Sequence, residues 1–212
     1  IYFISDILTK WISKPVIESF NKQKQFIADA SHELKTPLAV IMASSEALEN
    51  NPKEKKWLEN IQSESSRMNK LITNLLDLAK LEQENTEKVY ENSDLSKIVE
   101  KSVLTFESLI YEKTLKLDYH IGEKIFLNCN SDEIKEVLSI LIDNAIKHSD
   151  INGEIIIDLY QSGDNITLLV KNKGNPIPSG EEVKIFERFY RADSSRNRNE
   201  NRYGLGLAIA KR

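Results

Sequence analysis

The feature that most constrains the fold is a pair of long apolar stripes at helical spacing, separated by the stop signal Asn50-Asn51-Pro52. They predict one helix over residues 14–50 and a second over residues 53–87. Most steps within a stripe are of three, four or seven residues, as in the seam of a helical bundle. The stripes consist of Val16, Phe20, Ile27, Leu34, Leu38 and Ile41, and of Trp57, Ile61, Met68, Leu71, Ile72, Leu75, Leu78, Ala79 and Leu81.

Two such helices joined by a short turn form a hairpin, and one hairpin cannot cover both stripes. We therefore expect two chains to pair as a four-helix bundle. The alternative is that the hairpin packs on the domain that follows it in the same chain. Pro15 is expected in the first turn of the first helix, where its missing N–H group is tolerated.

The pattern changes after residues 82–94, a polar and charged stretch that we interpret as a linker. Two further helices are predicted, over residues 95–111 and 131–148, with Ser131 as the N-cap of the latter. Strands are predicted at 115–121, 125–127, 154–160 and 166–171, with a hairpin turn at 162–165. Helices and strands mixed in this way predict one α+β layer domain from about residue 93 onward.

The composition of the 212 residues fits a globular protein with a core, since 40% are hydrophobic and 29% are charged. The formal net charge of -4 argues against a general nucleic-acid binder. The single cysteine, Cys129, excludes an internal disulfide and a cysteine metal cluster. The apolar start, followed by Lys10, Trp11 and Lys14, fits the inner end of a membrane segment or the start of an ordinary amphipathic helix.

A first chemical cluster lies within the predicted first helix, at residues 26–38. His32 is next to the carboxylate of Glu33, and the hydroxyl of Thr36 follows four residues later. A helix that buries the flanking apolar residues turns His32 outward, with Thr36 one turn beyond it. An imidazole is a nucleophile near neutral pH, and a carboxylate can orient the proton on its other nitrogen. Pro37 is expected to bend or loosen the helix.

A second cluster consists of four short motifs, at residues 141–148, 170–178, 185–193 and 203–209. The amide oxygen of Asn144 suits Mg²⁺, and Lys147 can meet a phosphate. Gly174 lets a backbone come close to a flat ligand. Gly204 and Gly206 open a helix whose N–H groups can hold phosphate oxygens. Taken singly, each motif also fits an ordinary surface helix, turn or amphipathic run.

The run His-Glu-Leu-Lys-Thr-Pro at residues 32–37 resembles the phosphoacceptor box of sensor histidine kinases. In their order and spacing, the four later motifs resemble the N, G1, F and G2 boxes of the histidine-kinase ATP-binding domain. That domain is similar to the ATPase domains of gyrase and the heat-shock chaperones. The resemblance covers nearly the whole chain beyond residue 20. It implies an α+β protein, in which a helical hairpin that forms a dimeric four-helix bundle precedes an α/β-sandwich ATPase domain.

The resemblance also implies three segments and a cellular place. Residues 1–13 are expected to form a juxtamembrane or linker segment, and residues 14–88 the dimerisation and histidine phosphotransfer domain. Residues 89–212 are expected to form the catalytic ATP-binding domain, with its C-terminal strands missing. The protein is then the cytoplasmic portion of a cell-membrane protein, with a membrane anchor upstream of residue 1 and no nucleic-acid partner.

The resemblance implies ATP and Mg²⁺ as cofactors, and it implies roles for individual residues. His32 attacks the γ-phosphorus while Glu33 acts on the other ring nitrogen. The phosphoryl group then passes to an aspartate of a response regulator, and Thr36 positions water when that regulator is dephosphorylated. Asn144 is the implied Mg²⁺ ligand, and Asn172 and Gly174 lie at adenine. The residues implied near ribose or phosphate are Lys147, His148 and Arg191, and those along the phosphates are Gly204, Leu205 and Gly206. A mobile lid at about 174–203 is expected to cover the nucleotide.

Four positions depart from the family pattern. Ile140 replaces a second asparagine, Asn172 an aspartate, and Pro176 and Arg202 replace glycines. Two hypotheses follow. The first is a sensor histidine kinase that autophosphorylates His32, transfers the phosphoryl group to a response regulator and also dephosphorylates it. The second is a dimeric scaffold or phosphatase with a degenerate pocket, which binds a response regulator without autokinase activity.

Overall fold

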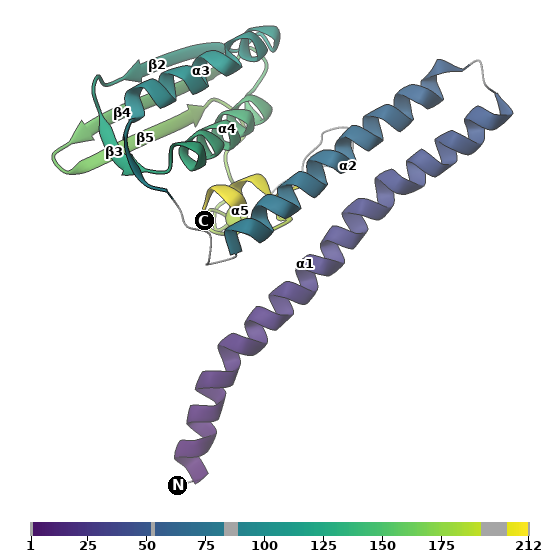
Figure 1. Ribbon diagram of the computed structural model, residues 1–212, viewed down its shortest axis with the longest axis horizontal. Coiled ribbons are helices and arrows are strands. Elements are labelled where there is room, and N and C mark those ends of the chain that lie inside the picture. Colours follow the sequence, from purple (N-terminus) through teal and green to yellow (C-terminus); the bar gives the residue numbers. More distant parts are fainter. Residues whose placement is uncertain (1, 52–53, 83–88, 192–202, 212) are drawn as a thin grey trace. The chain divides into compact units, whose positions relative to one another are not determined.

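The computed structural model describes residues 2–51, 54–82, 89–191 and 203–211 of the chain (Figure 1). The chain divides into two compact units. The first, which we call the hairpin unit, comprises residues 1–77 and 188–205. The second, which we call the sheet unit, comprises residues 78–187 and 206–212.

Two helices build most of the hairpin unit: α1 (Tyr2–Asn50) and α2 (Lys55–Glu82). The predicted start of the first helix at residue 14 is wrong, and Pro15 does not lie in its first turn. The residues before Pro15 contain no glycine or proline, so the helix continues through them, and through Pro15 and Pro37. A proline removes one backbone hydrogen bond, while the bonds on either side of it maintain the helix.

The turn between the two helices confirms the predicted hairpin. The N–H of Asn51 donates to the carbonyl of Ala47 at 3.0 Å, and the N–H of Glu54 donates to the carbonyl of Asn51 at 3.2 Å. The second helix begins two residues later than predicted and is described to Glu82; residues 83–88, which include the predicted end at 87, lie outside the described residues.

The hairpin buries one side of its helices and leaves apolar residues on another. Pro37, Ser44 and Leu71 are buried. Several large apolar side chains are exposed instead: Val16, Ile17, Phe20, Ile27, Leu38, Val40 and Met42 of α1, and Leu58, Ile72 and Leu76 of α2. Burial of a side chain of this size is worth about 1.5–3 kcal/mol. The exposed set is therefore a surface that association with another chain would stabilise.

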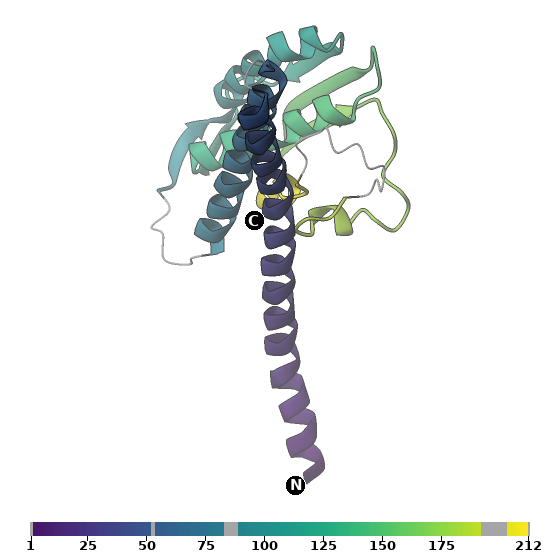
Figure 2. The ribbon, with the colours of Figure 1, turned by 90° about the vertical axis from the view of Figure 1, so that its right-hand side faces the viewer.

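The sheet unit contains a mixed sheet of strand order β2-β4-β5 and a smaller sheet of β1 and β3 (Figures 1 and 2). The strands are β1 (Glu91–Asp94), β2 (Lys116–Ile121), β3 (Phe126–Cys129), β4 (Glu154–Ser162) and β5 (Asn165–Asn172). β2 runs parallel to β4, and β5 runs antiparallel to it. The helices are α3 (Leu95–Glu112), α4 (Ser131–His148) and α5 (Gly206–Ala210), with a 3₁₀ helix, η1 (Lys184–Phe186).

Helices α3 and α4 contact each other and cover one face of the mixed sheet, α3 against β2 and α4 against β5. The register places Leu117 of β2 opposite Ile155 of β4, and Ile157 of β4 opposite Val170 of β5. The core forms between these layers and includes Val99, Val103, Ile110, Leu138, Ile142, Ile155, Ile157 and Leu159. This arrangement confirms the α+β fold with an α/β-sandwich domain after a helical hairpin.

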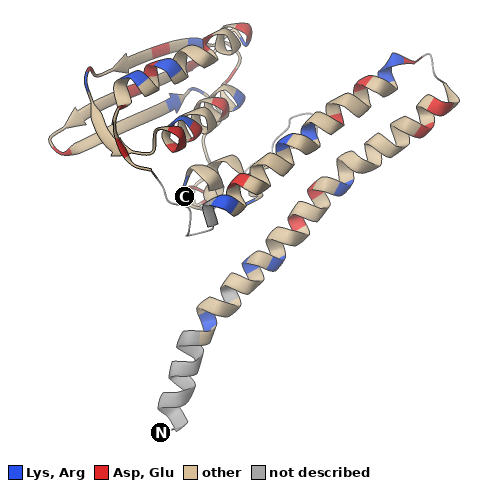
Figure 3. Ribbon diagram, in the orientation of Figure 1, with Lys and Arg blue, Asp and Glu red and all other residues tan. Residues whose placement is uncertain are grey.

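Charged residues of both signs are interspersed along α2 and α3 (Figure 3). At the start of α3, the N-cap Asp94 accepts a hydrogen bond from the N–H of Lys97 at 3.2 Å. Its other carboxylate oxygen lies 2.9 Å from Nζ of the same lysine. Hydrogen bonding to Lys97 is the main cause that lowers the pKa of Asp94. The cap therefore remains ionised to a lower pH than an isolated aspartate.

Two local expectations are wrong. The N-cap of α4 is Asn130 and not Ser131, since Oδ1 of Asn130 accepts hydrogen bonds from the N–H groups of Asp132 at 3.0 Å and Glu133 at 3.2 Å. The predicted linker at 82–94 contains the strand β1, which pairs antiparallel with β3.

Among the described residues, no helix has the length and apolar character needed to cross a membrane.

We predict that Ile157→Ala lowers the free energy of unfolding by about 2–5 kcal/mol, because it leaves a cavity between the sheet and its helices. Ile157 is fully buried, whereas Ile151 is 89% exposed. Urea unfolding followed by circular dichroism measures the change, and Ile151→Ala is the matched control with an expected loss under about 0.5 kcal/mol. Similar losses for both variants would contradict the assignment of Ile157 to the core.

Candidate functional site

Helix α1 presents His32 to solvent and keeps Glu33 half-buried beside it. This confirms the expected outward orientation of the imidazole. The hydroxyl of Thr36 lies one turn further along and donates to the carbonyl oxygen of His32 at 3.4 Å, a long hydrogen bond. An exposed imidazole with a neighbouring carboxylate can act as a nucleophile towards an incoming electrophile.

A residue of the third predicted motif pairs with a residue of the fourth in the hairpin unit. The N–H of Phe189 donates to the carbonyl oxygen of Gly204 at 3.0 Å. Gly204 has a φ of +66, and a Cβ there would lie 2.5 Å from the carbonyl oxygen of Tyr190. Glycine is therefore required at 204 both by the left-handed backbone and by the close approach. We call residues 188–190 and 203–205 the paired stems.

Two of the predicted residues, Gly204 and Leu205, are part of the paired stems, and Arg191 follows the first stem directly. Leu205 is 1% exposed, so the residue packs in the interior. Gly204 is half-buried, and Arg191 is exposed. Most of the second half of the predicted lid, residues 192–202 with Arg202, lies outside the described residues.

The sheet unit brings together residues from the end of α4 and the end of β5. The side-chain Nδ2 of Asn172 donates to the carbonyl oxygen of His148 at 3.1 Å. A Cβ on Gly174 would lie 1.8 Å from the same oxygen, so only glycine fits. The N–H of Asp150 donates to the carbonyl of Lys173 at 2.8 Å and adds a backbone link. Asn172, Gly174 and His148 therefore lie together, as the predicted site requires.

The hydrogen bond from Asn172 fixes the direction of its amide. A backbone carbonyl can only accept, so Nδ2 faces His148 and Oδ1 is left to accept a hydrogen bond from another group. An aspartate in this conformation would bring two acceptors together. The structure thus gives a physical reason for asparagine at a position where the family pattern has aspartate.

Asn144 lies half-buried on α4, one turn before the exposed His148. Lys147 forms an ion pair and a hydrogen bond with Asp143, which lies one turn earlier on the same helix. In this arrangement the ammonium group is neutralised by a carboxylate before any ligand is present. To make the predicted contact with ribose or phosphate, Lys147 would therefore have to leave Asp143 or contact both groups at once.

Helix α5 begins at Gly206, which confirms the predicted helix start. A Cβ on Gly206 would lie 3.2 Å from Cγ2 of Ile140 on α4. Ile140, which replaces the second asparagine of the family pattern, thus packs against the backbone of the glycine motif. An apolar contact takes the place of a polar side chain there.

The oxygen atoms that the described residues offer suit a hard cation that is bound mainly by the phosphates of a substrate. No group of three or more histidine, cysteine, aspartate or glutamate side chains among the described residues is arranged to hold a metal ion. Asn144 offers one amide oxygen on α4. Magnesium commonly keeps several waters and uses few protein ligands beside substrate phosphates, so this residue fits such a role.

Two family models match the chain. The His Kinase A (phospho-acceptor) domain matches residues 22–84, and the family of histidine kinase-, DNA gyrase B-, and HSP90-like ATPases matches residues 129–212. Sensor protein DltS of Streptococcus agalactiae is 36% identical over 208 residues, which are 98% of this chain and 52% of the relative. The chain belongs to the sensor histidine kinases.

A second relative of this chain is sensor histidine kinase YkoH of Bacillus subtilis, 38% identical over 92% of this chain and 43% of the relative. The chain thus spans about half the length of the curated relatives that it matches. Among solved structures, the catalytic domain of histidine kinase ThkA is 26% identical, with a TM-score of 0.51 over 57% of this chain and 77% of that chain.

Two longer structures share the fold of this chain. Histidine kinase AdeS of Acinetobacter baumannii has a TM-score of 0.66 and 24% identity, and the match covers 84% of this chain and 83% of that chain. ThkA in complex with response regulator protein TrrA has a TM-score of 0.71 and 20% identity, over 88% of this chain and 55% of that chain. The predicted family and fold class are confirmed.

We predict that Gly174→Ala lowers the free energy of unfolding by about 3 kcal/mol, because its methyl group would overlap the carbonyl oxygen of His148. Gly163→Ala is the matched control, since no atom lies within 4 Å of its added Cβ. Its left-handed backbone alone should cost about 1–2 kcal/mol. Urea unfolding compares the two, and an equal or smaller loss for Gly174→Ala would contradict the close approach.

Proposed function

We propose that this chain is the kinase portion of a sensor histidine kinase, which transfers the γ-phosphoryl group of ATP to His32. The observation that carries the proposal is an exposed imidazole beside a carboxylate, on a helical hairpin of the phosphoacceptor family joined to a domain of the ATPase family. A positioned nucleophile and an ATP-binding domain in one chain are the two parts that such a transfer needs.

In the proposed reaction a ring nitrogen of His32 forms a bond to the γ-phosphorus. The bond between that phosphorus and the oxygen bridging it to the β-phosphorus breaks, and ADP leaves. Glu33 orients or takes the proton of the other ring nitrogen, which keeps the attacking nitrogen in its basic form. The chain contributes position and charge stabilisation, which dominate phosphoryl transfer.

We assign the nucleotide roles as follows. Oδ1 of Asn172 accepts from the exocyclic amine of adenine, with Gly174 giving access. Asn144 ligates Mg²⁺, which would neutralise phosphate charge. The remaining contacts to ribose and phosphate come from Lys147, His148 and Arg191, and from the backbone of Gly204, Leu205 and Gly206. The amide direction set by His148 supports the first of these roles.

The same proposal includes two protein partners. The exposed apolar residues of α1 and α2 support a homodimer, in which two hairpins form a four-helix bundle. An aspartate of a response regulator receives the phosphoryl group, and Thr36 positions water for the reverse dephosphorylation. The complex of ThkA with TrrA supports a regulator docked on this fold.

The cellular setting is also a proposal. The matched relatives are about twice as long and carry the name sensor protein or sensor histidine kinase. We infer a cytoplasmic kinase portion of a cell-membrane protein, with the anchor upstream of residue 1. Residues 1–13 would then connect the anchor to the dimerisation domain at 14–88, which precedes the catalytic domain at 89–212.

The second candidate is a dimeric phosphatase or scaffold that binds a response regulator without phosphorylating His32. One contact favours it: Ile140 packs against Gly206 where the family has a polar group. A weaker nucleotide site would leave Thr36 as the active group of the hairpin.

Incubation of the whole protein with Mg²⁺-ATP labelled at the γ-phosphate tests the kinase. We predict an acid-labile label on His32 that is absent from His32→Gln. Glu33→Gln should label at least about 10²-fold more slowly, because it can no longer take the ring proton. Lys35→Gln, an exposed change two residues further on, is the control with unchanged labelling. An unlabelled wild type that still binds ATP would favour the phosphatase or scaffold.

Sedimentation velocity tests the dimer. We predict that Ile72→Glu with Leu76→Glu converts the dimer to a monomer, because it puts charges into the proposed interface. Both residues are substantially exposed in the single chain, at 43% and 56%, so its folding should change little. Thr73→Glu introduces the same charge at a neighbouring exposed polar position and should leave the dimer intact. A dimeric double variant would contradict this interface.

A further inference from the structure

Tyr203 joins the paired stems to α2 through its hydroxyl, which both donates and accepts a hydrogen bond. Its hydroxyl donates to the carbonyl oxygen of Arg67 at 2.9 Å and accepts from Nε of Arg67 at 3.1 Å. The guanidinium carbon lies 5.5 Å from the centre of the tyrosine ring. Tyr203 is 4% exposed, so these interactions form in a largely desolvated place, where they are stronger than in water.

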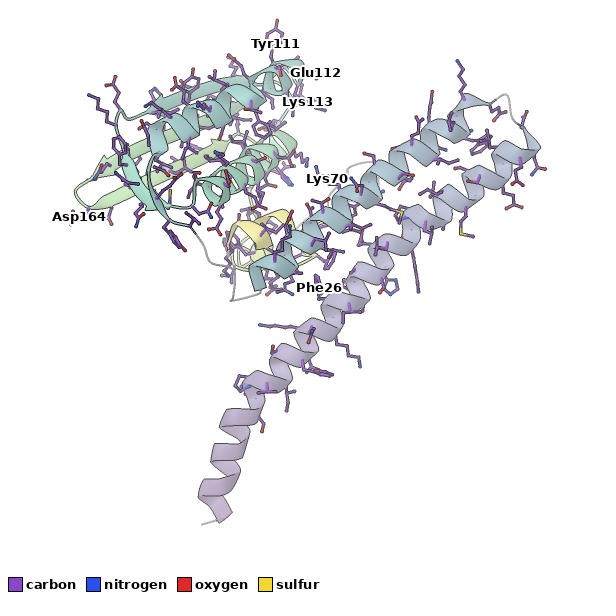
Figure 4. All side chains as sticks on the ribbon, viewed as in Figure 1. Phe26, Lys70, Tyr111, Glu112, Lys113 and Asp164 are labelled. Carbon is purple, nitrogen blue, oxygen red and sulfur yellow. The ribbon has the colours of Figure 1, made fainter. Side chains whose placement is uncertain are left out.

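A second contact joins the stems to α1. The rings of Phe26 and Phe189 lie 5.7 Å apart at an interplanar angle of 42°, a favourable tilted geometry. The guanidinium carbon of Arg188 lies 5.0 Å from the centre of the Phe26 ring. Phe26 is labelled on α1 in Figure 4. Helix α1 thus contacts the stem at 188–190, and α2 contacts the stem at 203–205. The hydrogen bond from the N–H of Phe189 to the carbonyl oxygen of Gly204 joins the two stems.

The stems lie on the side of α1 that carries Glu33. Phe26 and Glu33 are seven residues apart, so they share one face of the helix. Burial raises the pKa of Tyr203, Arg67 lowers it, and the charges of Glu33 and Glu64 raise it further. The charge of Glu33 therefore reaches Tyr203. Since Glu33 is next to His32, the stems are held at the level of the phosphoacceptor.

We propose that Arg67, Tyr203 and Phe26 are positioning residues, which hold the start of the glycine motif on the acceptor hairpin during phosphoryl transfer. The inference rests on the proposed function, in which the backbone of Gly204 and Leu205 contacts the phosphates. Tyr203 is bonded directly to Gly204, so a fixed tyrosine fixes that backbone. Phosphoryl transfer depends steeply on such placement, because a displacement of about 1 Å can slow it about 10²-fold.

Arg67 is itself oriented from α2. Its Nη1 lies 3.7 Å from a carboxylate oxygen of Glu64, one turn earlier on the helix. The guanidinium thus contacts a carboxylate through Nη1 and the hydroxyl of Tyr203 through Nε. A lysine keeps the charge but lacks the planar fork that serves both partners.

The test compares Tyr203→Phe, Arg67→Ala and Arg67→Lys in the whole protein with Mg²⁺-ATP. Tyr203→Phe keeps the buried ring and removes only the hydroxyl. We expect labelling of His32 at saturating ATP to slow about 10-fold in Tyr203→Phe and Arg67→Ala, with the Kd for ATP within about 2-fold of wild type. Arg67→Lys should be intermediate, and the double variant should be no slower than the slower single variant, because both remove one interaction.

Controls match each change. Tyr160→Phe removes a hydroxyl from a tyrosine that is 49% exposed on β4. Lys70→Ala removes a cation from α2 at a position one turn beyond Arg67 (Figure 4). Both should label like wild type. A matched thermal unfolding midpoint shows that each variant is folded.

Several results would overturn the positioning role. They are unchanged or faster labelling in Tyr203→Phe and Arg67→Ala, or a loss of ATP affinity equal to the loss of rate. Hydrogen exchange gives a readout without activity: the N–H of Phe189, bonded to Gly204, should exchange faster in Tyr203→Phe, and equal exchange would count against the contact. A wild type without label on His32 refutes the proposed function, whereas a labelled wild type with equally active variants refutes only this inference.

Discussion

The carbonyl oxygen of His148 is the point on which the geometry of the sheet unit depends. It accepts the amide of Asn172 and leaves no room for a side chain at Gly174. One backbone atom at the end of α4 therefore sets the position of the loop after β5. Because α4 is anchored by Leu138 and Ile142 in the core, the loop inherits the rigidity of the helix and sheet below it. Asn144, His148 and Asn172 are thus held on packed elements rather than on a free loop.

Most of the fold could be predicted because its elements carry strong periodic signals. The alternation in β4 reflects burial on one face, which a sequence displays directly. The stripes of α1 and α2 have the spacing of helices, which predicted the helices although several stripe residues are exposed in the single chain. The strand β1 has no such signal: its residues are Glu, Asn, Ser and Asp, and it exists because β3 supplies its hydrogen-bond partners. The N-cap of α4 was misplaced by one residue because Asn130 and Ser131 are both good caps, and only the geometry separates them.

In the candidate site, too, local features could be predicted from the sequence and tertiary contacts could not. The exposure of His32 follows from the local helix and was predicted, whereas its role in transfer stays a prediction until labelling is measured. The contact of Arg67 with Tyr203 joins residues 136 positions apart, so no local pattern could indicate it. The replacements at 140 and 172 were visible in the sequence, but their reasons were not. Ile140 packs on Gly206, and the amide of Asn172 needs the carbonyl of His148, and both partners come from the tertiary fold.

The unbroken course of α1 has a mechanical consequence. The helix runs from Tyr2 through Pro15 to His32 without interruption, a rod of about 45 Å at 1.5 Å per residue. A rotation of its first turn about the helix axis therefore rotates the imidazole of His32 in the same direction. Pro15, where one rung of hydrogen bonding is missing, is the place along this rod that bends most easily. The rotation of α1 at one end and the angular position of His32 at the other are thus coupled by a single secondary-structure element.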